Sequence, residues 1–160
     1  MRLRHLVMSL VCALGMLTAP AQASESAPAF ELPGDHGSVA LSRYRGQVVY
    51  LDFWASWCLP CRQSFPWMNG LQQRYGAKGL KVIAVNLDKD RDAIARFIAA
   101  TQPGFTLAYD SEGAVAERYG VEVMPSSYLI DRTGNIVLRH RGFREADTAA
   151  LEEQIRSLLK

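Results

Sequence analysis

The sequence predicts a three-layer α/β domain, with a mixed central β-sheet flanked by helices. Apolar segments of strand length alternate with segments of helical periodicity through much of the chain. Two further strands, joined by a short polar connection, and a final helix then follow. Alternating strands and helices favour parallel pairing, whereas a hairpin adds antiparallel strands. The sheet is therefore expected to contain both kinds of pairing.

Residues 1–23 are interpreted as an export signal and are left out of the fold. Arg2 and Arg4 are followed by an apolar run, a proline and small residues that end at Ala23. That order is typical of a secretory signal peptide, which leaves residues 24–160 as the single domain. The apolar run is shorter than the about 20 residues of a membrane span. Retention as an uncleaved anchor is the alternative, and either reading predicts a periplasmic protein.

Charge argues against a nucleic-acid partner. The full chain has 18 basic and 16 acidic residues, and all the acidic ones lie beyond residue 23. Arg2 and Arg4 account for the basic excess, so the exported part is neutral and carries no basic cluster. We expect a monomer that binds no nucleic acid.

The first half of the domain is predicted from local patterns. Residues 24–29 are small and polar and are expected to form a short tail. Residues 30–41 contain two brief apolar pieces around a Pro-Gly-Asp segment, which predicts an N-terminal β-hairpin extension. Residues 48–54 are apolar around a single acid and predict a buried strand. Residues 59–75 have helical character, and Pro66 inside them is expected to kink the helix.

The second half continues the alternation. Residues 80–87, rich in Val and Ile, predict a strand, and residues 90–100 predict an amphipathic helix. Residues 105–109 predict a short extended piece. Residues 111–119 predict a short helix, whose start around Ser111 and Ala114 resembles a capped one and which Gly120 ends. The remaining elements are expected to be two strands and a helix, at 127–130, 136–141 and 148–159.

The cysteines indicate redox chemistry. Cys12 lies in the export signal, which leaves Cys58 and Cys61 in a C-x-x-C arrangement. Closing so short a loop removes little entropy from the unfolded chain, so a purely structural disulfide is not favoured. Cys58 falls where a strand turns into a helix, and a helix N-terminus stabilises the thiolate that attacks disulfides. We predict Cys58 as the nucleophile and Cys61 as the resolving thiol, with Pro60 suited to the first turn.

The segment from Asp52 to Cys61 resembles the active-site region of the thioredoxin superfamily. Pro66 follows Cys61 by five residues, like the kinking proline of that family, and the sequence around Pro125 resembles its cis-proline loop. The resemblance narrows to the exported TlpA/ResA-like branch because of the N-terminal extension, the export signal, the insertion-like stretch at 88–103 and the segment at 128–134. The resemblance covers about residues 30–159 and implies a thioredoxin fold and dithiol–disulfide exchange.

The resemblance also implies roles for individual residues. Pro125 is expected to be cis and to bring the backbone of Met124 towards the dithiol; an ordinary turn proline is the alternative. Asp52 is expected to be buried, with a raised pKa that lets it assist Cys61, where many members of the branch carry Asn. A solvent-facing acid is the alternative there. Trp57 is expected to form an apolar wall beside Cys58. The client-binding residues are thus predicted to be Trp57, Pro60 and Met124.

The other candidate residues can also be interpreted as ordinary structural residues. Asp88 lies roughly where some relatives carry a buried Glu that tunes the dithiol, but a helix-capping or solvated acid is the alternative. Trp54 fits the core as well as the site. His36 and His140 lack metal-binding spacing and are expected to be ordinary surface residues. Met68 is expected to be packing, and we expect no metal and no other cofactor.

The predicted function is reduction of disulfides in client proteins through Cys58 and Cys61. The resemblance implies a membrane thiol reductant of the DsbD or CcdA type as the electron donor. It offers haem-site thiols in cytochrome c maturation, or thiols of a copper site, as clients. Ser126 follows Pro125 where relatives dedicated to cytochrome c often carry an acid, which favours a general reductase. A Cu(I)-binding module using the same dithiol is the alternative. A thiol peroxidase is not favoured, because no Thr lies upstream of Cys58 within the same loop.

Overall fold

The computed structural model describes residues 25–160, in which one mixed sheet of eight strands is arranged in the order β1-β8-β7-β4-β5-β6-β2-β3. The predicted signal peptide, with Cys12, lies outside the described residues. The strands are β1 (Glu25–Ser26), β2 (Glu31–Gly34), β3 (Gly37–Ala40), β4 (Val48–Trp54), β5 (Leu80–Asn86), β6 (Thr106–Tyr109), β7 (Ser126–Ile130) and β8 (Asn135–Arg141). The helices, with 3-10 turns written η, are η1 (Leu41–Tyr44), α1 (Leu59–Tyr75), η2 (Gly76–Lys78), α2 (Arg91–Thr101), α3 (Ala114–Tyr119), η3 (Glu145–Asp147) and α4 (Thr148–Leu159).

The predicted mixed sheet is confirmed. β4, β5 and β6 run parallel, whereas β7 is antiparallel to β4 and β8 is antiparallel to β7. All seven residues of β4 are buried, as expected for a strand at the centre of a sheet covered on both sides. β4 therefore leads from the buried centre of the sheet directly to the dithiol at the start of α1.

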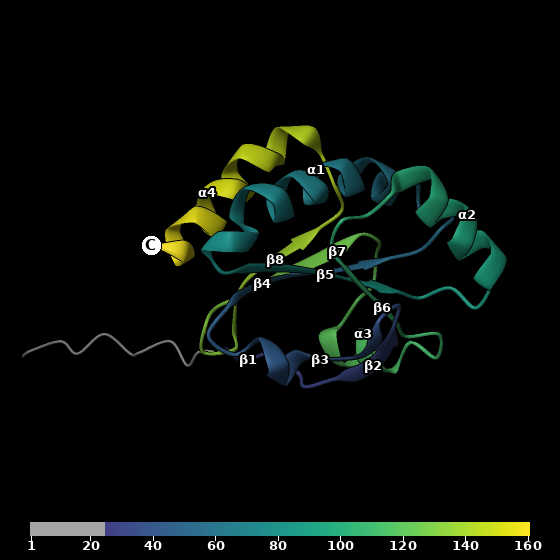
Figure 1. Ribbon diagram of the computed structural model, residues 1–160, viewed down its shortest axis with the longest axis horizontal. Helices are drawn as coiled ribbons and strands as arrows, with labels where there is room; N and C mark the ends of the chain where they lie inside the picture. The colour runs from purple at the N-terminus through teal and green to yellow at the C-terminus, as the bar shows by residue number, and fades with distance from the viewer. Residues whose placement is uncertain (1–24) are drawn as a thin grey trace, which may run out of the picture.

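Figure 1 shows α1, α2 and α4 above the central strands of the sheet, with α3 and the β2–β3 hairpin, which forms one edge of the same sheet, below them. Because strand side chains alternate between faces, β4 contributes to two separate cores. Tyr50 and Trp54 belong to the upper cluster with Phe65 of α1. Leu51 and Phe53 belong to the lower cluster, which the hairpin and α3 complete. The sheet thus separates an upper layer that carries the dithiol from a lower layer that does not.

Several predicted boundaries are confirmed, and one segment is corrected. The helices expected at 59–75 and 148–159 and the hairpin within 30–41 form as predicted. α1 continues through Pro66. The expected tail at 24–29 is wrong in part, because β1 pairs antiparallel with β8. Without β1, the edge of β8 would present unpaired backbone N–H and C=O groups. The composition of residues 24–29 does not show that this edge lies beside them.

The start of α3 also differs from the prediction. The helix begins at Ala114 rather than near Ser111. The buried carboxylate of Asp110 accepts hydrogen bonds from the amides of Val115 and Ala116, both at 2.9 Å. The cap of α3 therefore comes from Asp110, which directly precedes the predicted start around Ser111 and Ala114. Within residues 25–160 no helix combines the length and apolarity needed to cross a membrane.

Candidate active site

Cys58 and Cys61 form a disulfide at the junction between β4 and α1. Their Cα atoms are 5.3 Å apart. Cys58 is the N-cap residue of α1, and its Sγ accepts a hydrogen bond from the backbone amide of Cys61 at 3.2 Å. The first turn of α1 carries no acidic residue. After reduction, the same amide and the helix dipole favour negative charge on the Cys58 sulfur.

The two cysteines differ in access to solvent. Cys58 keeps 4% of its surface exposed, whereas Cys61 is completely enclosed among Phe65 and Met68 of the upper cluster. Of the two cysteines, only Cys58 therefore offers any exposed surface to an approaching disulfide. This asymmetry is the one required if Cys58 attacks first and Cys61 completes the exchange.

Exposed apolar side chains stand on both sides of Cys58 in the chain. Trp57 and Leu59, its two neighbours, are 72% and 68% exposed. Exposed apolar side chains gathered in one place are typical of an interaction surface. Trp57 projects into solvent, so it is available for contact with a partner beside the dithiol.

The peptide bond between Met124 and Pro125 is cis, as predicted, and the alternative of an ordinary turn proline is wrong. Pro125 is buried directly before β7. Met124 packs against the cluster that contains both cysteines. The Ser126 hydroxyl donates to the carbonyl of Val123 at 2.7 Å and closes this turn. Residues far apart in sequence thus meet at one face.

Asp52 is buried, and the alternative of a solvent-facing acid is wrong. Only 1% of its surface is exposed, and it lies between Ala84 of β5 and Ser127 of β7. Burial raises the pKa of Asp52 well above its usual range, while a hydrogen bond from Ser127 acts in the opposite direction. Its Oδ2 atom has no hydrogen-bond partner among the described residues. Asp52 is on the same face of β4 as Tyr50 and Trp54, the face that α1 covers.

Asp88 has a role that neither reading of the sequence anticipated. Its carboxylate accepts hydrogen bonds from the backbone amide of Ser56 at 2.7 Å and from the Ser56 hydroxyl at 3.0 Å. Asn86 donates a third at 2.8 Å. Asp90, not Asp88, caps α2. Asp88 therefore ties the end of β5 to the loop that leads into Cys58.

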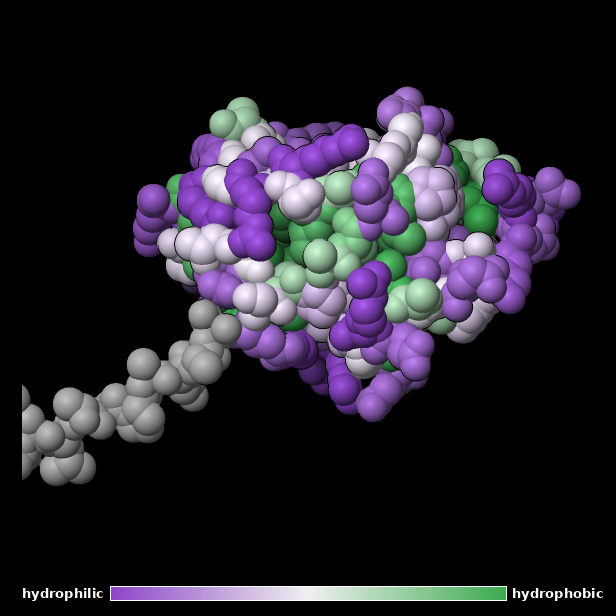
Figure 2. Space-filling model, turned by 90° about the horizontal axis from the view of Figure 1, so that it is seen from below, coloured by the Kyte–Doolittle hydropathy of each residue, from purple (hydrophilic) through white to green (hydrophobic). Residues whose placement is uncertain are grey.

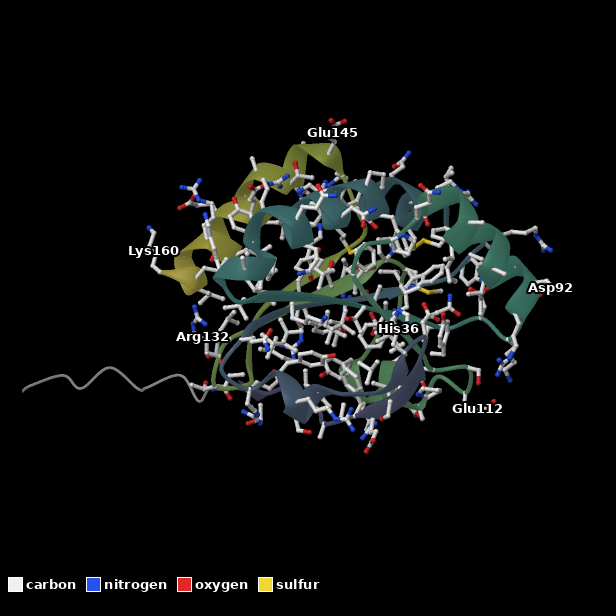
Figure 3. The ribbon with its side chains drawn as sticks, in the orientation of Figure 1. His36, Asp92, Glu112, Arg132, Glu145 and Lys160 are labelled. Carbon is white, nitrogen blue, oxygen red and sulfur yellow. A yellow bond between two sulfur atoms is a disulfide. The ribbon has the colours of Figure 1, made fainter. Side chains whose placement is uncertain are left out.

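The remaining candidates divide between core and surface. Trp54 and Met68 are fully buried and belong to the core. His36 is exposed in the hairpin turn, as expected, and is labelled in Figure 3. His140 departs from the expectation of an ordinary surface residue, because it is partly buried with its Nε2 atom 3.5 Å from a carboxylate oxygen of Asp147. Among residues 25–160 no group of three or more His, Cys, Asp or Glu is placed to hold a metal ion.

A cavity of about 870 Å³ opens between the hairpin and α2. Asp88 is on its wall, but neither cysteine lines it. Cys58 instead retains a small exposed area between its chain neighbours Trp57 and Leu59, whose apolar side chains are exposed. Such a surface suits the disulfide of another protein better than an enclosed small molecule.

Comparisons with known proteins agree with this chemistry. The Redoxin family profile matches residues 22–155. The thiol-disulfide oxidoreductase ResA of Bacillus cereus (strain ATCC 10987) is 33% identical over 135 residues, which cover 84% of this chain and 77% of the relative. ResA of Bacillus subtilis (strain 168) is 30% identical over 141 residues, 82% of this chain and 79% of the relative. A crystal structure from Chlorobium tepidum, proposed to be a thiol:disulfide interchange protein DsbE, is 54% identical with a TM-score of 0.84, over 86% of this chain and 97% of that one.

Proposed function

Because the chain belongs to the Redoxin family and is a ResA-like thiol–disulfide oxidoreductase, we propose that it reduces disulfides of client proteins outside the cytoplasm. The observation that carries this proposal is the asymmetry of the dithiol, in which Cys58 reaches the surface at a helix N-terminus and Cys61 is enclosed behind it. A protein that only carried a structural disulfide would not require that difference.

The exchange proceeds in two steps. The Cys58 thiolate attacks one sulfur of the client disulfide, forms a mixed disulfide, and releases the other client sulfur as a thiolate, which takes a proton from solvent. Cys61 then gives its proton to the carboxylate of Asp52 and attacks the Cys58 sulfur. The bond between Cys58 and Cys61 closes, and the second client thiolate leaves. Two electrons have passed from the protein to the client.

Client recognition follows from the surroundings of Cys58. Met124 packs against the cluster that contains both cysteines, and its backbone precedes the cis Pro125. An extended client segment can pair with that backbone, as in β-strand addition. Trp57 and Pro60 are close to Cys58 in the chain and exposed, so they can supply apolar contact to the client.

The proposal also includes export and an electron donor. The order of residues 1–23 supports export to the periplasm, with either a cleaved signal or a retained anchor. After each turnover the disulfide must be reduced again, and we assign this to a membrane thiol reductant of the DsbD or CcdA type. Haem-site thiols of cytochrome c and thiols of a copper site are the client classes. The Ser126 side chain after Pro125 favours a general reductase.

The Cu(I)-binding alternative receives less support. A cuprous ion delivered by the dithiol would need both sulfurs within reach of the partner that receives it. Cys61 has no exposed surface, and Pro125 is buried at the start of β7. The enclosed second sulfur suits an intramolecular exchange better than metal transfer.

The proposal is tested by trapping. In a Cys61→Ser variant the mixed disulfide on Cys58 cannot be resolved, so client proteins should be recovered covalently attached to it. They should be released by dithiothreitol and identified by mass spectrometry. The Cys58→Ser, Cys61→Ser double variant is the matched control and should trap none. Recovery of no client above this control would count against the proposed activity.

The direction of electron flow has its own test. Equilibration of purified protein with glutathione buffers measures how readily the Cys58–Cys61 disulfide forms. A reductase should have a reducing potential, in the range of thioredoxin, about −270 mV. A potential near that of a strong oxidant, about −120 mV, would reverse the proposed direction while leaving the exchange chemistry intact.

A further inference from the structure

A row of polar side chains crosses the upper face of the sheet next to the dithiol layer. Asp52 of β4 lies directly opposite Ser127 of β7, and Ser127 lies directly opposite His140 of β8. Residues opposed in this way project to the same face, with Cβ atoms about 4.5–5.5 Å apart. Tyr50 precedes Asp52 by two residues and shares its face. Ser127 therefore lies between Asp52 and His140 on this face, next to Tyr50.

The Ser127 hydroxyl has a defined donor direction. Tyr50 donates its hydroxyl hydrogen to Ser127 Oγ at 2.8 Å. A serine hydroxyl has one hydrogen to give, and the bond from Tyr50 occupies one of its acceptor positions. Burial raises the pKa of Tyr50, so Tyr50 stays protonated and remains a donor. The Ser127 hydrogen is therefore available for Asp52, whose Oδ2 atom has no partner among the described residues.

We propose that Ser127, oriented by Tyr50, is the positioning residue that sets the proton affinity of Asp52 and thereby the pH at which Cys61 is activated. The inference rests on the role that the proposed function gives to Asp52. A donor to the ionised carboxylate stabilises that form, whereas burial alone favours the protonated acid. An acid kept protonated at neutral pH could not accept the Cys61 proton. During exchange the proton moves from Cys61 to Asp52, and Ser127 and Tyr50 keep theirs.

The other ionisable groups around this row are few. Cys61 belongs to α1, which covers the face on which Asp52 is buried. Ala84 of β5 is the neighbour of Asp52 on the side away from Ser127, and it carries no charge. On the other side of Ser127 from Asp52 lies His140, whose Nε2 atom is 3.5 Å from a carboxylate oxygen of Asp147 in η3. Both groups beyond Ser127 are unchanged in the variants below, so their influence is common to every protein compared.

The test reads the titration of Asp52 directly. In the oxidised protein, in which the cysteines do not titrate, the carbon-13 shift of the Asp52 carboxyl carbon is followed against pH by NMR. Ser127→Ala should raise the midpoint by about 1 to 2 pH units, the size of a lost hydrogen bond to a charged group. Tyr50→Phe should raise it less, because the Ser127 hydroxyl remains but loses its polarising neighbour.

Two further variants separate a tuning role from a packing role. Ser126→Ala removes the neighbouring buried hydroxyl, which bonds to Val123 rather than to the row, and should leave the midpoint unchanged. Ser127→Thr keeps a hydroxyl and should remain close to the wild-type value. An unchanged midpoint in Ser127→Ala, or an equal change in Ser126→Ala, would overturn the inference. The readout needs no client, so a failure of the trapping experiment would count against the proposed function and leave this comparison intact.

Discussion

A buried carboxyl such as Asp52 is stable in the fold mainly in its neutral form, because water is absent to solvate the charge. In the exchange that we propose, the same burial raises the proton affinity of the carboxylate and so suits it to accept the Cys61 proton. Under that proposal, Asp52 links the stability of the domain to its chemistry at a single residue.

Asp52→Asn should change how stability depends on pH. The pKa of Asp52 is raised in the folded state, so between about pH 4 and that folded pKa the folded protein holds a proton that the unfolded chain has lost. Over this window the wild-type free energy of unfolding should fall by about 1.4 kcal/mol per pH unit relative to the Asn variant, and the difference should then level off. Urea unfolding of both oxidised proteins from pH 4 to pH 8 measures it. A difference that stays constant across that range would mean that Asp52 does not titrate anomalously.

Asp88 is a second residue whose side chain supports the site, here through hydrogen bonds that hold the loop before Cys58. Asp88→Ala should reduce the free energy of unfolding by about 1–3 kcal/mol, because it leaves the amide and hydroxyl of Ser56 without their acceptor. Urea unfolding at pH 7 checks the loss, with the exposed neighbour changed in Lys89→Ala as the control. Equal stability of the two variants would show that the contact between β5 and the loop before Cys58 contributes little.

At the scale of elements, the N-termini of α1 and α3 are capped in different ways. α1 begins at a cap supplied by its own chain neighbour, Cys58, and the C-x-x-C spacing fixes that contact. α3 begins after Gly113, which has a positive φ of 73° and contributes no side chain. Its amides are instead satisfied by Asp110, which follows β6. A short helix of this kind depends on a carboxylate held by the sheet.

Asp110→Ala should therefore destabilise the protein by about 1–2 kcal/mol, the usual effect of losing a side-chain cap. Ser111→Ala, at the position first expected to cap the helix, should change stability by less than about 0.5 kcal/mol. Denaturant midpoints of the two variants distinguish the assignments. The opposite ranking would return the cap to Ser111.

At the scale of the whole molecule, the sheet separates the lower hydrophobic core from the upper core that contains the dithiol. The lower core is closed by the N-terminal segment, where Phe30 packs against Tyr119, and the hydroxyl of Tyr119 donates to the carbonyl of Pro28 at 2.8 Å. Figure 2, viewed from below, shows apolar residues at the centre of this face with hydrophilic residues around them. Neither cysteine belongs to this cluster. The N-terminal extension therefore completes a hydrophobic layer that the dithiol does not touch.

Phe30→Ala should lower the free energy of unfolding by about 3 kcal/mol, because it opens a cavity in the lower core. The equilibrium of the dithiol with glutathione should stay as in the wild type, since the sheet lies between the two. His36→Ala, in the exposed hairpin turn, should alter neither quantity. A change in the glutathione equilibrium of Phe30→Ala comparable to the loss of stability would show that the two layers are coupled.

The sequence alone was sufficient for features that depend on neighbours a few residues apart. Periodicity and capping placed the helix at 59–75 and the final helix at 148–159, and the C-x-x-C motif placed the dithiol at the start of α1. The resemblance to thioredoxin-like proteins, which rests on several short motifs, correctly predicted the cis bond before Pro125 and the burial of Asp52. Each of these features is encoded by a short stretch of chain.

Only the tertiary structure determined which distant residues meet. The pairing of β1 with β8, the contact of Asp88 with Ser56 and the placement of Ser127 opposite Asp52 join segments between about 30 and 110 residues apart. Strand register sets these contacts, and register is the outcome of packing both faces of the sheet at once. A polar residue's own neighbours in sequence do not specify its partner across the sheet. For that reason the dithiol and the buried acid Asp52 were predictable from the sequence, whereas the contacts of Ser127 with Asp52 and of Asp88 with Ser56 were not.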